Sequence, residues 1–302
     1  MTFSSDFLWL YLALGASFLN AIVVLIDKYL LVSPAVGKPA VYAFYVGSLS
    51  AAALLLLPFG VVLVPTIMVL WLSLVAGISY VYALLFLYKS LKLSDASDVA
   101  PVFGAVSTVA TFGFSFIFLG GSLSGNFLSG FILLVVGTFI TSYFHLTKKA
   151  ILFLVVAGVM FGFSTVFLKE LFNQTAFWNG FFWSRLANVL GVVILFLWSN
   201  NARAILDNIK TSSMGTKTAV VVNKVIAGFA FLLILYAIKL GDVSVVNALT
   251  GVQFAFLLLF AILFSKRFPE YFYESVHHHH HAILRKLVAT VLIMVGLFLL
   301  FL

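Results

Sequence analysis

Long apolar runs separated by short polar connections make up almost the whole chain. A transmembrane helix needs about 20 consecutive apolar residues. Runs of about this length lie at 7–30, 40–63, 66–88, 98–119, 126–146, 150–172, 177–198, 217–240, 243–265 and 283–302. The longer polar connections are 199–216 and 266–282, and no stretch looks like a soluble domain. The pattern therefore predicts an all-α integral membrane protein with ten transmembrane helices.

Composition agrees with lipid as the solvent of this chain. Hydrophobic residues make up 64% of it and charged residues only 9%, whereas a soluble domain carries about 25% charge. Cysteine is absent, which rules out disulfides, thiolate metal sites and a cysteine nucleophile. No phosphate-binding Gly-x-x-x-x-Gly-Lys-Ser/Thr loop and no His-Glu-x-x-His motif occurs. We therefore expect a multi-pass protein of the cell membrane that is not an enzyme and has no cofactor or metal.

One stretch of the chain occurs twice. Residues 92–106 read KLSDASDVAPVFGAV and residues 239–253 read KLGDVSVVNALTGVQ. At a fixed offset of 147, the residues Lys92, Leu93, Asp95, Ser97, Val99 and Gly104 match Lys239, Leu240, Asp242, Ser244, Val246 and Gly251. The match predicts an internal duplication, with a first repeat at 1–147 and a second at 148–302.

The number of spans in each half determines how the two halves relate. Five predicted spans fall in each half, and an odd number makes the second half enter the membrane from the opposite side. The duplication therefore predicts two inverted five-helix repeats. Such folds place a substrate site near the membrane midplane, between the repeats, and open it alternately to each side.

Basic residues are distributed unequally between the two faces of the predicted membrane domain. Connections after the first, third, fifth, seventh and ninth spans carry Lys28, Lys38, Lys89, Lys92, Lys148, Lys149, Arg203, Lys210, Lys217, Lys266, Arg267, Arg285 and Lys286. The other face carries only Lys169 and Lys239. The positive-inside rule places the first set in the cytoplasm and both termini outside. It also accounts for the net charge of +8 without a nucleic-acid partner.

With these features the chain resembles the drug/metabolite transporter (DMT) superfamily, EamA type. The resemblance rests on ten spans in two inverted repeats, the Lys-Leu-x-Asp-x-Ser turns into the fourth and ninth spans, and Pro101. It covers nearly the whole chain. It implies a secondary transporter of small metabolites such as amino acids, often an exporter.

Two departures from the family pattern bear on what the resemblance implies. Family halves commonly carry a Gly-Glu-Arg-like turn after their fourth span, but here the turns read Gly120-Gly121-Ser122 and Ser265-Lys266-Arg267. The acid is missing from both turns. Family members are also often drawn with both termini in the cytoplasm, the reverse of the orientation that the charge count predicts.

Two cations lie deep in predicted spans. Arg185 is in the seventh span and Lys224 in the eighth, and a charge at the bilayer centre costs at least about 2.5–3.5 kcal/mol. We expect them to form a cationic patch for a carboxylate or phosphate, with Asn188 and Asn223 as hydrogen-bonding neighbours. The alternative is structural: Arg185 would pair with Glu170, and Lys224 would extend toward the cytoplasmic edge.

Further polar and aromatic residues are candidates for the lining of a substrate cavity. They are Asn20, Asn247, Gln253, Trp183 and Tyr80. The alternative for the amides is hydrogen bonding between helices, and for the aromatic rings packing in the core or against lipid.

Three other features suggest roles in coupling or gating. Asp27 and Glu170 occupy matched positions near the ends of the first and sixth spans, as carboxylates for proton coupling or as interfacial ion-pair partners. Pro101 frees a backbone carbonyl and is a candidate gating hinge. The run His277 to His281 would bind a metal or sense pH, or would form a solvated loop.

These features predict a secondary-active transporter. It would export a small polar metabolite, such as an amino acid or organic anion, by alternating access, with the proton as a candidate coupling ion. The alternatives are a flippase of a lipid-linked phosphate carrier and a non-transporting membrane scaffold. Inversion within one chain makes a monomer sufficient and leaves a homodimer open.

Overall fold

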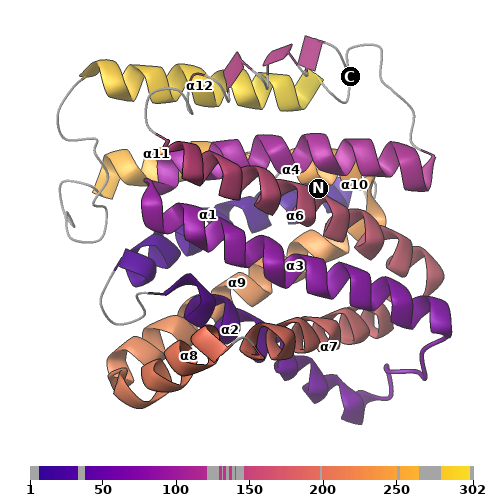
Figure 1. Ribbon diagram of the computed structural model, residues 1–302. Helices are drawn as coiled ribbons and strands as arrows, with labels where there is room; N and C mark the ends of the chain where they lie inside the picture. The colour runs from indigo at the N-terminus through magenta and orange to yellow at the C-terminus, as the bar shows by residue number, and fades with distance from the viewer. Residues whose placement is uncertain are drawn as a thin grey trace.

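The fold is built of helices throughout the part of the chain that the structure describes. This computed structural model describes residues 7–32, 38–120, 129–130, 132–133, 136–137, 140, 146–197, 199–249, 252–264 and 280–299. Figure 1 shows the helices and their labels. They are α1 (Leu8–Val32), α2 (Pro39–Leu49), the 3-10 helix η2 (Ser50–Phe59), α3 (Ile67–Leu93), α4 (Ala96–Leu119), α6 (Lys148–Gln174), α7 (Phe177–Phe196), α8 (Ser199–Thr211), α9 (Met214–Leu240), α10 (Val243–Leu249), α11 (Val252–Phe264) and α12 (His280–Leu299).

Seven helical segments among the described residues are long and apolar enough to cross a membrane. They are α1, α2 together with η2, α3, α4, α6, α7 and α9. Each coincides with a predicted span to within a few residues. The fold is thus all-α, with helices suited to a multi-pass membrane protein.

The three remaining predicted spans are only partly covered by the described residues. Most of 126–146 is outside them. In the span predicted at 243–265 the described residues form α10 and α11, and residues 250–251 between them lie outside the description. The last span corresponds to α12, whose apolar part is Leu287–Gly296.

The connection predicted at 199–216 contains a helix, α8. Its residues Ala204 and Ile205 are buried, and it packs against α2 and α7. The Tyr45 hydroxyl of α2 donates a hydrogen bond to Oδ1 of Asn208, at 3.1 Å. Apolar residues on one side of a polar helix let α8 lie against the bundle without crossing the membrane.

Close helix contacts depend on small residues. A Cβ atom on Gly162 of α6 would lie 2.7 Å from the Thr111 nitrogen of α4, and one on Gly158 would lie 2.6 Å from a Val106 methyl. On α3, a Cβ on Gly77 would meet Ala187 of α7 at 2.6 Å. Small residues let membrane helices approach this closely, and packing then holds them together where water supplies no driving force.

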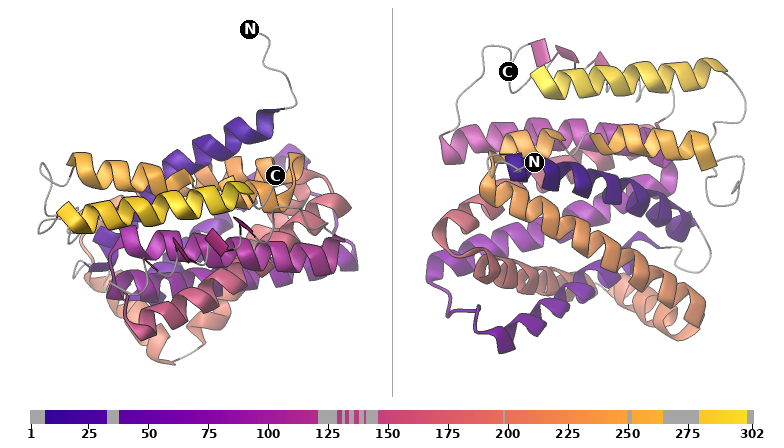
Figure 2. Two further views of the ribbon diagram at one scale, coloured as in Figure 1. Left: turned by 90° about the horizontal axis from the view of Figure 1, so that it is seen from above. Right: turned by 180° about the vertical axis from the view of Figure 1, so that it is seen from behind.

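Helices from the two parts of the chain pack against each other in the bundle. The most extensive contacts join α3 with α6 and α7, α4 with α6, and α1 with α9. Each pairs a helix before residue 120 with one after residue 147. Helix α12 packs against α4 and lies at one edge of the bundle (Figures 1 and 2). A space enclosed in the centre is therefore bounded by both parts of the chain.

Candidate functional site

A central cavity of about 150 Å3 lies between the packed helices. Residues of α1, α3, α4, α6, α9, α10 and α11 line it, together with Val46 of α2. Most of the lining is apolar. The polar side chains are Asn20, Asp27, Tyr80, Tyr88, Ser107, Thr165, Lys224 and Gln253.

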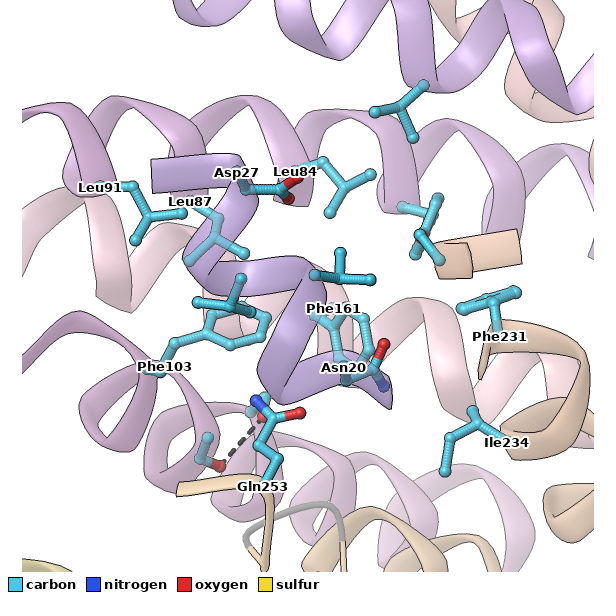
Figure 3. Close-up of a pocket in the computed structure, with 18 of the residues that line it drawn as sticks. Asn20, Asp27, Leu84, Leu87, Leu91, Phe103, Phe161, Phe231, Ile234 and Gln253 are labelled. Carbon is cyan, nitrogen blue, oxygen red and sulfur yellow. Dashed lines mark hydrogen bonds between the residues drawn. The ribbon is translucent and has the colours of Figure 1, made fainter. Parts of the chain in front are cut away.

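Two amides point into this cavity from different helices. Figure 3 shows Asn20 of α1 and Gln253 of α11 with their side chains directed inward, near Phe103, Phe161 and Phe231. Asp27 lies farther along α1, toward one end of the space (Figure 3). The cavity thus has amide donors and acceptors in one region, a carboxylate in another and aromatic walls between them.

The carboxylate belongs to a buried polar cluster formed by four helices. Oδ1 of Asp27 lies 2.7 Å from Nζ of Lys224 on α9. The same oxygen accepts hydrogen bonds from the amide of Asn223 at 2.5 Å and from the hydroxyl of Tyr42 on α2. Nζ of Lys224 also donates to the hydroxyl oxygen of Tyr88 on α3, at 3.4 Å. One carboxylate oxygen therefore receives three donors in a region from which water is largely excluded.

The aromatic rings of this cluster also face the ammonium group. Nζ of Lys224 lies 4.3 Å from the ring centroid of Tyr42 and 5.6 Å from that of Tyr88. The two rings contact each other with centroids 4.8 Å apart. Ring quadrupoles attract a cation, so the rings and the carboxylate together stabilise a lysine that is only 7% exposed.

Arg185 of α7 has a different environment. Its guanidinium carbon lies 4.5 Å from the ring centroid of Phe231, and 5.5 Å from those of Tyr80 and Phe181. Its Nη1 lies 3.2 Å from Asn188 when the amide of Asn188 presents its oxygen to the guanidinium, which satisfies both amide atoms. Nε and Nη2 are buried without a hydrogen-bond partner among the described residues.

Arg185 lines a second space, which we call the lateral groove. It measures about 350 Å3 and lies between α2, η2, α3, α7 and α9. The lateral groove and the central cavity share the lining residues Val46, Tyr80, Lys224, Ala227 and Phe231. The two cations predicted to act together thus lie at neighbouring spaces: Lys224 borders both, and Arg185 only the lateral groove.

The remaining predicted residues lie elsewhere. Trp183 lines neither space, and its Nε1 donates to the Leu63 carbonyl at 3.1 Å. Glu170 accepts from Asn173 and Gln174 near the surface and does not pair with Arg185.

The last candidates are Pro101, Asn247 and the histidine run. Pro101 is buried within α4, a continuous helix. The Asn247 side chain lies outside the described residues, as do His277 to His279 and the side chains of the other two histidines.

Sequence reasoning missed part of the polar cluster. It identified Asp27, Asn223 and Lys224 separately but did not pair Asp27 with Lys224. It did not single out Tyr42 or Tyr88. The available signal was depth: Asp27 near the end of one span and Lys224 past the start of another approach the middle from the same face.

Comparisons with known proteins bear on the fold alone. No family model and no curated protein matches this chain. Among 27 matching chains of solved structures, one described as "Crystal structure of protein" aligns with a TM-score of 0.58 and 18% sequence identity. The alignment covers 95% of this chain and 98% of that chain. The chain is thus similar over nearly its whole length to a fold already seen in a crystal.

Proposed function

We propose that the chain is a secondary-active transporter of the drug/metabolite transporter (DMT), EamA type, which exports a small polar metabolite by alternating access. The observation that carries the proposal is the central cavity, bounded by helices from both parts of the chain and containing a buried ion pair. A charged pair inside a membrane domain is costly, and a cavity beside it gives it a ligand-binding role. A scaffold would need neither.

A repeated contact supports two inverted five-helix repeats in a ten-span protein. Nζ of Lys28 on α1 donates to the carbonyls of Leu91 and Ser94, both at 2.8 Å. Nζ of Lys169 on α6 donates to those of Ile238 and Gly241, both at 2.9 Å. The two carbonyl pairs are 147 residues apart, the offset of the repeated stretch.

These two contacts, which we call the lysine clamps, join equivalent elements. In each, a lysine from the first helix of a predicted half binds the turn between the third and fourth spans of the same half. The turns join α3 to α4 in the first half and α9 to α10 in the second. Carbonyls at helix ends lack partners within the helix. Lysines thus bind equivalent helix-end carbonyls in both halves. This fits a duplicated, inverted fold with the substrate between its halves.

The chemistry of the central cavity suggests the class of substrate. Its volume of about 150 Å3 is below the roughly 300–1,000 Å3 typical of sites for drug-sized ligands. Lys224 would take a carboxylate, Asp27 an ammonium group, and Asn20 and Gln253 neutral polar atoms. An amino acid or small organic anion has this combination of size and polarity.

Asp27 is the residue through which a proton would couple to transport. Protonation of its carboxylate would weaken the bond to Lys224 and leave the lysine free to bind an anionic substrate. Glu170, the matched carboxylate, lies outside the cavity. The proposed coupling is therefore asymmetric between the halves.

The test is substrate exchange by the full chain in proteoliposomes. Vesicles loaded in turn with unlabelled amino acids and organic anions would be assayed for uptake of the corresponding labelled compound. We expect exchange of at least one compound, with a loss of tenfold or more in Asn20→Leu and Gln253→Leu. Trp183→Phe, outside the cavity, is the matched control and should retain exchange. Absence of exchange with every compound, or equal exchange by the cavity variants, would contradict the proposal.

A further inference from the structure

The lateral groove has the properties of a site for a molecule that arrives from the lipid. Its walls are largely apolar and include Leu49, Leu55, Val225 and Leu232. Leu55 is 73% exposed and Val225 is 66% exposed, and exposed aliphatic side chains on membrane-spanning helices face acyl chains. The groove therefore opens between η2 and α9 toward the bilayer.

Arg185 interrupts this apolar surface with a strongly polar group. Arg185 is 7% exposed, and its Nε and Nη2 have no hydrogen-bond partner within the described part of the chain. No carboxylate of the described residues forms an ion pair with it. A buried cation without a counter-ion is strongly unfavourable, so the site favours an anion.

Lys224 does not change this preference. It borders the groove, but Asp27 neutralises it at 2.7 Å. Of the two cations that line the groove, Arg185 is thus the one without a carboxylate partner among the described residues. A guanidinium offers two parallel donors to an oxyanion, and the two unpartnered nitrogens match this demand.

We propose that the lateral groove binds an anionic lipid of the bilayer, with the phosphate headgroup on Arg185 and an acyl chain along α2, η2 and α9. The headgroup takes the unpartnered guanidinium donors, which requires the guanidinium to turn toward the groove because both nitrogens are buried in this structure. The acyl chain covers the apolar walls. Such a site is also what the flippase alternative requires. The binding itself is independent of the proposed metabolite transport, because it needs only the groove and its arginine.

Trp178 provides a local readout of occupancy. It lines the groove and is 44% exposed. The full chain would be reconstituted in nanodiscs containing brominated phosphatidic acid or brominated phosphatidylcholine with matched acyl chains. Comparison with Trp178→Phe isolates the quenching of this one tryptophan. We expect brominated phosphatidic acid to quench it at a several-fold lower mole fraction than brominated phosphatidylcholine.

Variants separate the headgroup from the groove. Arg185→Gln should abolish the preference for phosphatidic acid. Gly228→Leu should reduce quenching by either lipid, because Gly228 lines the groove and a Cβ there meets no atom of the described residues within 4 Å. Lys89→Met is the matched control: it removes a cation held over Phe86 and Phe153, away from the groove, and should keep the preference.

Two results would overturn the proposal. One is equal quenching of Trp178 by the two brominated lipids in the unmodified chain. The other is full displacement of brominated phosphatidic acid by millimolar inorganic phosphate, which would identify a site for free phosphate instead. Exchange of a small metabolite by the same purified chain in proteoliposomes would leave the proposed transport intact in either case.

Discussion

At the scale of single residues, the Asp27–Lys224 pair explains how the bundle holds two charges. Three helices, α2, α3 and α9, direct polar or aromatic side chains at this pair. A buried ion pair is stable only when its geometry is good and its other hydrogen-bonding capacity is used. Besides Lys224, Tyr42 and Asn223 donate to the same oxygen of Asp27, and they meet much of that demand.

Removing both partners of this pair should cost less than the sum of the two single removals. Asp27→Asn leaves Lys224 without a counter-ion, and Lys224→Met leaves the carboxylate uncompensated. Each should lower the free energy of unfolding by about 3–5 kcal/mol. The double variant Asp27→Asn/Lys224→Met should lose clearly less than the sum of the two single losses. Denaturant unfolding in mixed micelles measures all three, and strictly additive losses would show that the two groups are not coupled.

How much of the site was predictable depended on whether a residue is rare in its setting. Arg185 and Lys224 stand out because few charges interrupt the spans. Their environments did not follow, since side-chain partners depend on helix rotation and on exact helix ends. Helix α9 begins at Met214, before the predicted start at 217. Tyr42 and Tyr88 carried no signal among 11 tyrosines and 34 phenylalanines.

At the scale of helices, apolar run length predicted the long elements because bilayer thickness sets their length. It did not predict α8, whose pattern of buried Ala204 and Ile205 is hidden by the polar residues around them. Hydrophobicity indicates which residues avoid water, but not which short polar helices lie against the bundle.

Packing between α4 and α6 should be sensitive to a single methyl group. Gly162→Ala places a Cβ 2.7 Å from the Thr111 nitrogen, so the helices must separate. We expect a loss of stability of about 1–3 kcal/mol, the range for overpacking. Gly113→Ala on α4 is the matched control, because its Cβ meets no atom of the described residues within 4 Å. It should be neutral or gain up to about 1 kcal/mol from better helix propensity. Thermal unfolding in one detergent compares the two, and equal melting temperatures would refute the packing argument.

At the scale of the whole molecule, the lysine clamps suggest how the two ends of the bundle are held. Lys28 binds the turn between α3 and α4, and Lys169 the turn between α9 and α10. In an inverted repeat these two turns lie at opposite faces of the membrane. Under the proposed mechanism, loss of one clamp favours opening at its own face.

The absence of cysteine allows this to be tested by single-cysteine labelling. Thr211→Cys and Val64→Cys serve as markers for the two faces: both positions are exposed, on α8 and in the connection after η2. The basic-residue count predicts that an impermeant maleimide labels position 211 from the cytoplasm and position 64 from outside. Labelling of either marker from the reverse side would invert the predicted orientation.

Against these markers, a cysteine at Asn20 reports access to the central cavity. Lys28→Met should increase its labelling from the face that labels position 211, because the released clamp lies near the end of α1 on that side. Lys169→Met should increase its labelling from the other face. Opposite shifts from two equivalent contacts are what an inverted repeat requires, since each clamp closes one face only. A shift toward the same face in both variants would mean that the clamps merely stabilise helix ends, and that alternating access must depend on other contacts.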